Sequence, residues 1–138
     1  MAGNVSAFPV RFAGAATART ALLATSRPIA VGHFLFVAGA FAALATSFIT
    51  SDFSVANVAT NSNSKLPAAY RFAATWGSHE GSILLWTLMM ALWTAVVALK
   101  SRHLPRTLAA RALAVMGLIN AGLLLFVLFT SNPFLRLL

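Results

Sequence analysis

The residues capable of chemistry are few, and two of them, His79 and Glu80, lie together in residues 76–82, which spell WGSHEGS. A zinc-protease helix would need a second histidine one turn after His79 and Glu80, but residue 83 is isoleucine. Glu80 and Asp52 are the only carboxylates of the chain, and it contains no cysteine. The sequence therefore excludes carboxylate-pair acid–base catalysis, thiolate chemistry and cysteine-bound metals, and it predicts no metal site.

Aromatic side chains accompany His79 at helical spacing. On one continuous helix, a stripe about 100° wide would contain Trp76, His79, Ile83, Trp86, Met90 and Trp93. Such a stripe could receive a large flat hydrophobic ligand, with the imidazole as an axial ligand or hydrogen-bond donor. Alternatively, the stripe packs against a neighbouring helix, which is the commoner use of such a pattern. Gly77 and Gly81 also weaken the assumption of an unbroken helix.

Glu80 is unusual because a carboxylate at the edge of the hydrocarbon is costly unless it is paired or lies at a helix N-terminus. Arg71 and Lys65 are its possible partners in the sequence. A helix that starts at this point would satisfy the charge without either partner. We therefore expect the charge of Glu80 to matter more for folding or assembly than the imidazole of His79 does.

The elements that must position these residues are membrane helices. Of the 138 residues, 59% are hydrophobic and 9% are charged, with ten Lys and Arg against two acids and a net charge of +8. The sequence predicts an all-α integral membrane protein with three transmembrane helices. The expected segments are a basic inner-side segment (1–27), a transmembrane helix (28–49), an outer loop (50–71), an interfacial turn with a transmembrane helix (72–99), a basic inner loop (100–111), a transmembrane helix (112–131) and an outer tail (132–138).

The cations flank the apolar runs instead of forming one polar face, which indicates topology signals and argues against nucleic-acid binding. Residues 100–111 carry four cations and no acid, whereas residues 50–71 carry two cations and one acid. The positive-inside rule therefore predicts the N-terminus inside and the C-terminus outside, with His79 on the outer side. Residues 1–27 have the composition of either a basic loop or an organelle transit peptide, and we favour the loop.

Three further polar residues lie near or within the apolar runs. Asn120 interrupts the third expected span, where its amide could hydrogen-bond across helices. His33 and His103 have no partner apparent in the sequence. We interpret both histidines as having no role beyond their position in the topology.

Residues 76–86, WGSHEGSILLW, closely resemble the WGxHEGSxLLW motif of the CcmF family of cytochrome c-type biogenesis proteins. Residues 52–55, 61–64, 66–71 and 129–134 are also similar to this family in order and spacing, and the resemblance covers about residues 28–138. The positions that match the family motif are Trp76, Gly77, His79, Glu80, Gly81, Ser82 and Trp86.

The resemblance implies a membrane subunit of a heme lyase, which handles heme for covalent attachment to apocytochrome c. Implied partners are a heme chaperone, apocytochrome c and other maturation subunits, in a bacterial inner membrane or, alternatively, a mitochondrial inner membrane. The candidate heme-proximal residues are Trp76, His79 and Trp86. The alternative function is a structural membrane module that scaffolds partner subunits without binding heme.

The sequence also departs from the family. Members of the family carry a Trp-rich outer-loop motif and heme-ligand histidines, which follow the segment similar to residues 129–134. Neither feature is among these 138 residues. The chain therefore resembles an N-terminal portion of a family member, either truncated or one part of a split protein. We expect the main heme site to lie outside this chain, and we expect that the chain alone is not catalytic.

Overall fold

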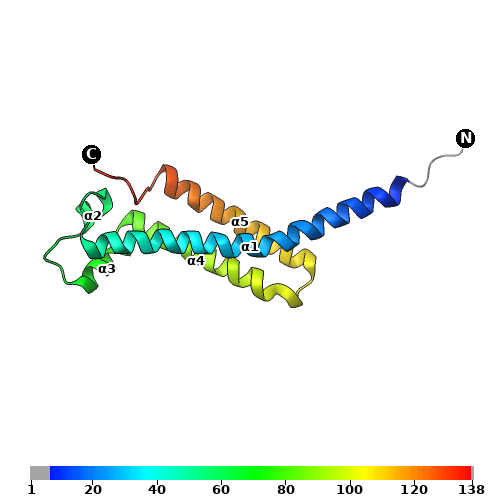
Figure 1. Ribbon diagram of the computed structural model, residues 1–138, viewed down its shortest axis with the longest axis horizontal. Coiled ribbons are helices and arrows are strands. Elements are labelled where there is room, and N and C mark those ends of the chain that lie inside the picture. Colours follow the sequence, from blue (N-terminus) through cyan, green and yellow to red (C-terminus); the bar gives the residue numbers. More distant parts are fainter. Residues whose placement is uncertain (1–6, 138) are drawn as a thin grey trace, which may run out of the picture.

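The computed structural model describes residues 7–137, with the side chains of residues 24–105 and 107–137. The described elements are α1 (Ala7–Thr50), α2 (Ala56–Asn61), α3 (Ala68–Gly77), α4 (His79–Lys100), the short 3₁₀ helix η1 (Ser101–His103) and α5 (Arg106–Phe129). Three long helices, α1, α4 and α5, form the body of the molecule, and the short helices α2 and α3 lie together at one end of it (Figure 1). Part of the segment expected as an outer loop is thus helical.

Three segments of the described chain are long and apolar enough to cross a membrane, namely residues 24–50, 79–103 and 107–129. The prediction of a mostly helical protein with three helices long and apolar enough to cross a membrane is confirmed for the described residues. The first helix was expected to start at Pro28, but α1 starts at Ala7 and continues through this proline. Proline removes one backbone hydrogen bond inside a helix, and long membrane helices tolerate this loss. The described part of the expected basic loop 1–27 is therefore helical from Ala7, whereas residues 1–6 lie outside the described residues.

The helix α4 is central, because α1, α3 and α5 all pack against it. Its buried residues are mostly small: Gly81, Leu84, Thr87, Ala91, Thr94, Ala95 and Ala98. Small side chains let helix backbones approach closely, and this contact replaces the hydrophobic effect as the source of helix association in lipid. The larger side chains Trp86 and Trp93 face away from the bundle and are exposed.

The chain turns sharply where α1 ends. Ser51 has a positive φ of 57°, and the amides of Ser51 and Asp52 donate to the carbonyls of Phe48 and Ser47 at 3.2 and 2.9 Å. This pattern closes the open end of α1 and is the Schellman arrangement, usually built on glycine. It directs the chain into α2 and places Phe48 and Val58 in the buried core.

The C-terminal tail returns to the same end of the bundle. Ala56 N donates to Leu135 O at 2.8 Å, and Leu137 N donates to Ser54 O at 2.8 Å, on either side of an antiparallel bridge between Val55 and Arg136. Residues 51–78 and 130–137 therefore form one unit, which we call the cap end. Both acids, Asp52 and Glu80, lie in or next to it.

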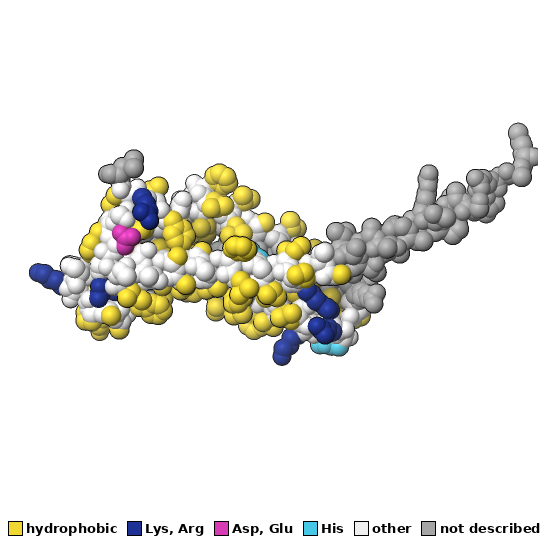
Figure 2. Space-filling view, viewed as in Figure 1, with side chains coloured by type: hydrophobic (Ala, Val, Ile, Leu, Met, Phe, Trp, Pro, Cys, Tyr) yellow, Lys and Arg dark blue, Asp and Glu magenta, His cyan; other side chains and the backbone are white. Residues whose placement is uncertain are grey.

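The opposite end of the bundle is cationic. We call it the basic end and define it by Arg27, Lys100, Arg102 and Arg111. Figure 2 shows dark blue side chains gathered where α4 joins α5, and dark blue side chains together with an acidic one at the far end of the molecule. The two ends therefore differ in that the cap end combines cations with acids, whereas the defining residues of the basic end are all cations.

Candidate functional site

The motif of residues 76–82, which contains His79 and Glu80, lies at a corner between two helices. The chain leaves the helical conformation at Ser78, whose φ of −80° and ψ of 155° are extended, so α3 ends and α4 begins here. Ser78 Oγ accepts a hydrogen bond from Gly81 N at 3.0 Å and caps the N-terminus of α4. The continuous helix assumed for the aromatic stripe was therefore wrong, because an N-cap residue requires a non-helical backbone.

Gly81 makes this corner sterically possible. A Cβ atom at position 81 would overlap the backbone carbonyl oxygen of Thr75 and would lie 2.8 Å from Ser78 Oγ. By contrast, a Cβ atom at Gly77 would meet nothing within 4 Å. Two glycines of the same short motif therefore have different physical importance.

His79 and Glu80 form the first turn of α4. His79 is exposed, and Glu80 is half-buried at a position where the N-terminal end of the helix dipole favours a carboxylate. Arg71, which the sequence offered as a partner of Glu80, instead donates from Nη1 to Ser51 Oγ at 2.7 Å. The structure therefore places Glu80 in the first turn of α4 and engages Arg71 elsewhere.

The three tryptophans do not share one face. Trp76 lies on α3, where its ring meets that of Phe72 edge to face with centroids 5.1 Å apart and an interplanar angle of 87°. Trp86 lies on the outward face of α4 and is 68% exposed. Because Trp86 and Trp93 face outward, the alternative interpretation that the stripe packs against a neighbouring helix does not hold for these two residues within the described chain.

The corner does not form a closed heme site from the described residues. His79 is one exposed imidazole, whereas His33 lies within the span of α1 and His103 lies at the basic end. The described residues contain no cluster of three or more His, Cys, Asp or Glu that could hold a metal ion. A heme held by two strong axial ligands does not fit this arrangement.

Asp52, the other acid, accepts hydrogen bonds within the turn that follows α1. Its Oδ1 accepts hydrogen bonds from the Ser54 hydroxyl at 2.6 Å and from the Ser54 backbone N–H at 3.2 Å. The hydroxyl first, and then the backbone N–H, hold the pKa of Asp52 below its ordinary value. This carboxylate is therefore a structural acceptor in the cap end.

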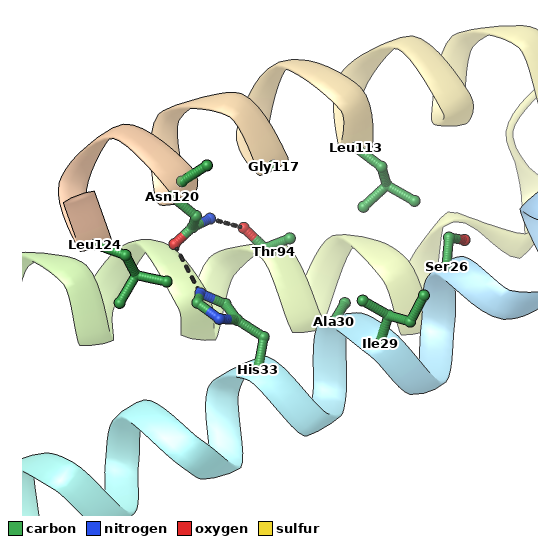
Figure 3. Close-up of a pocket in the computed structure, with 10 residues that line it drawn as sticks. Ser26, Ile29, Ala30, His33, Thr94, Leu113, Gly117, Asn120 and Leu124 are labelled. Atoms are coloured by element: carbon green, nitrogen blue, oxygen red, sulfur yellow. Dashed lines mark hydrogen bonds between the residues drawn. The ribbon is translucent and has the colours of Figure 1, made fainter.

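A second polar cluster lies deep between the long helices and joins all three of them. Asn120 of α5 lies between His33 of α1 and Thr94 of α4 (Figure 3). Its Nδ2 donates to Thr94 Oγ1 at 2.9 Å, and its Oδ1 lies 3.2 Å from His33 Nε2. The prediction that Asn120 bonds across helices is confirmed. The interpretation of His33 as a bystander was wrong, because its partner lies 87 residues away in the sequence.

The surrounding contacts determine the orientation of this amide. Asn120 also approaches the backbone carbonyl of Met116 at 2.9 Å, and only the amide nitrogen can donate there. Oδ1 must then face His33, so His33 Nε2 carries the hydrogen that it donates. Thr94 uses its own hydroxyl hydrogen on Met90 O at 2.7 Å. In these contacts every side-chain donor of the cluster is used.

A groove runs along this cluster between α1 and α5, and we call it the α1–α5 groove. Its volume is about 410 Å³, and it is open on one side. The α1 side contributes Ile29, Ala30 and His33, and the α5 side contributes Leu113 and Gly117 together with Asn120 and Leu124 (Figure 3). Thr94 of α4 also lines it. The groove is mostly apolar, and no motif in the sequence predicted it.

Comparison with known proteins identifies relatives across most of the chain. It is 52% identical over 123 residues to the cytochrome c-type biogenesis protein CcmF of Escherichia coli strain K12, a match that covers 89% of this chain and 19% of that protein. It is 55% identical over 116 residues to CcmF of Pseudomonas aeruginosa, covering 84% of this chain and 18% of the relative. It is also 50% identical over 115 residues to the biogenesis protein ccl1 of Rhodobacter capsulatus, covering 83% of this chain and 18% of the relative.

No family model matches the chain, and no solved structure matches it. The chain spans about a fifth of the length of the relatives it matches. Identity near one half over such a length does not arise by chance, and the aligned residues fill most of this chain. By sequence, therefore, the chain belongs to the CcmF family of cytochrome c-type biogenesis proteins.

Proposed function

We propose that this chain acts in cytochrome c maturation as a membrane-embedded part of the heme lyase, in a bacterial inner membrane. The observation that carries the proposal is the identity of about one half to bacterial proteins named for cytochrome c-type biogenesis. The three membrane-length helices support the membrane location. In this role the chain contributes to the handling of heme for covalent attachment to apocytochrome c, with a heme chaperone and other maturation subunits as partners.

The proposal includes an orientation in which the cap end faces outward and the basic end faces the cytoplasm. The cap end carries three cations, Lys65, Arg71 and Arg136, against the two acids. The basic end carries four cations and no acid among its defining residues. Because short loops rich in Lys and Arg are retained inside, this asymmetry supports N-terminus inside and C-terminus outside.

Reporter fusions test the orientation. Alkaline phosphatase, which is active only outside the cytoplasm, should be active when fused after Asn61 and inactive when fused after Arg106. A cytoplasmic reporter fused at the same two positions should give the reverse pattern. Phosphatase activity at Arg106 without activity at Asn61 would contradict the orientation and would place His79 on the inner side.

We assign Trp76, His79 and Trp86 to contact with heme or with the partner that delivers it. The exposure of His79 and Trp86 supports this assignment, since both are accessible from outside the chain. The lack of a closed two-ligand site at the corner supports a main heme site beyond the described residues. The corner is then a surface passed by heme and not its resting position.

A chimera tests the function in a working system. In an E. coli strain lacking its own CcmF, the aligned 123 residues of that protein are replaced by those of this chain. Covalently bound heme in c-type cytochromes, detected after denaturing electrophoresis, should be restored. A chimera that accumulates normally but attaches no heme would contradict the proposed function.

Point variants of the chimera separate heme handling from scaffolding. His79→Ala and Trp86→Ala should each lower heme attachment about tenfold, the factor that corresponds to losing a contact worth about 1.4 kcal/mol, while the chimera still accumulates. Trp93→Ala is the matched control, since Trp93 is also exposed on α4 but lies outside the motif. If heme attachment only follows the amount of protein in all three variants, the scaffolding alternative is correct.

A further inference from the structure

The α1–α5 groove has apolar walls and a floor whose side-chain donors are all used within the protein. Its walls are formed by Ile29, Ala30, Leu113 and Leu124. At the floor, His33 Nε2 donates to Asn120, both amide hydrogens of Asn120 are used, and the Thr94 hydroxyl donates to Met90 O. No side-chain donor of this cluster remains for an anion or a carbonyl. An anion or a carbonyl therefore finds no free side-chain donor deep in the groove, and the apolar walls favour an apolar occupant there.

The length of the groove matches one leaflet of a bilayer. Its α5 side runs from Leu113 to Leu124, which are eleven residues apart and so about 16 Å along the helix. One leaflet contributes about 15 Å, half of the hydrocarbon thickness of about 30 Å. The groove therefore has the length of the acyl region of a single leaflet.

One end of the groove lies next to the basic end. Ser26 and Leu113 line the part nearest this end. Arg27 directly follows Ser26, and Arg111 lies two residues before Leu113. Lys100, the last residue of α4, and Arg102 of η1 lie where the chain turns from α4 into α5, and both acids lie at the opposite end. The charge next to this end of the groove is thus positive, which complements a phosphate group.

We propose that the α1–α5 groove holds one acyl chain of an anionic phospholipid whose headgroup lies at the basic end, next to Arg27 and Arg111. The apolar walls bind the acyl chain, and the self-satisfied floor of His33, Asn120 and Thr94 limits its depth. The cations bind the phosphate group. This inference does not depend on the proposed function or on which side of the membrane the basic end faces.

Native mass spectrometry tests the proposal. The 138-residue chain is reconstituted in nanodiscs that contain equal amounts of POPC and the anionic lipid POPG, and it is then released into mild detergent. We expect one POPG molecule to remain bound to each chain. Retention of POPC and POPG in equal amounts would overturn the proposed preference for an anionic lipid.

Two glycines of α5 provide matched variants for the groove. Gly117 lines the groove and Gly122 does not, and a Cβ atom at either position would meet nothing within 4 Å. Gly117→Leu should place its side chain in the groove and abolish lipid retention, whereas Gly122→Leu should retain the lipid. Circular dichroism should show equal helix content for both variants. Equal lipid retention by the two variants would overturn the proposed site.

Charge variants test the headgroup contact. Arg27→Gln and Arg111→Gln should each lower the preference for POPG over POPC about fivefold, with POPC retention unchanged. Lys65→Gln removes the same charge at the cap end and should leave the preference unchanged. An unchanged preference in both arginine variants would overturn the headgroup assignment.

Lipid-free dimers that become monomers on Gly117→Leu would overturn the proposal as well, because a second copy of the chain would then occupy the groove.

Discussion

Alanine at position 81 should strongly destabilise the chain, although it adds only one methyl group. The new Cβ atom would overlap the carbonyl oxygen of Thr75. This oxygen belongs to the backbone of α3, so it cannot move away as the end of a flexible side chain could. Relief requires α3 to shift relative to α4, and we expect a loss of about 3 kcal/mol, at the upper end of the cost of overpacking. Unfolding of the purified chain in mixed detergent micelles measures this loss.

Gly77→Ala is the matched control, because it makes the same chemical change four residues earlier in the same motif. A Cβ atom there would meet nothing within 4 Å, and alanine favours helix by about 0.5–1 kcal/mol over glycine. This variant should therefore unfold at the same or slightly higher denaturant concentration than the parent chain. If the two alanine variants are equally stable, the close approach of Gly81 to Thr75 does not govern the corner.

Asn120→Leu should weaken the association of all three long helices. The substitution nearly conserves volume but removes the acceptor of His33 Nε2 and the donor to Thr94 Oγ1. His33 then keeps a polar N–H in an apolar groove, and we expect a loss of about 1–3 kcal/mol in the free energy of unfolding. The same micelle unfolding assay measures it.

The double variant Asn120→Leu with His33→Leu separates the hydrogen bond from general packing. Replacing both partners by apolar groups leaves no donor unsatisfied, so the double variant should lose less stability than the sum of the two single variants. His103→Leu, at the basic end, is the matched histidine control and should combine additively with Asn120→Leu. Additive losses for His33 and Asn120 would show that their contact contributes nothing to stability.

The number and approximate positions of the spans could be predicted from the sequence because they depend on local composition. An uncharged apolar run of sufficient length has one favourable environment, the hydrocarbon of a bilayer, whatever its neighbours are. The cross-helix role of Asn120 was predictable for the same reason, since an amide at that depth needs a partner. The family was also recognisable, because its motif is one continuous stretch of sequence, residues 76–86, and does not depend on the fold.

The position of the helix break could not be predicted with the same certainty. The spacing of the aromatic residues fits a continuous helix from Trp76 to Trp93, whereas the chain breaks at Ser78. The break depends on the contact between Gly81 and Thr75, which exists only once α3 and α4 have their observed directions. The sequence also predicted that the first transmembrane helix starts at Pro28, because the uncharged run begins there. In the structure, α1 continues through Pro28.

Sequence alone therefore determined which segments are long and apolar enough to cross a membrane, where the cations gather along the chain and which motif the chain carries. The tertiary structure decided which residues meet. His33 bonds to a residue 87 positions away, and the α1–α5 groove exists because α1 and α5 both pack on α4 and leave a space between them. The physical reason is range: hydropathy and charge act on a segment by itself, whereas a hydrogen bond across helices and a groove between them depend on relative positions that no single segment specifies.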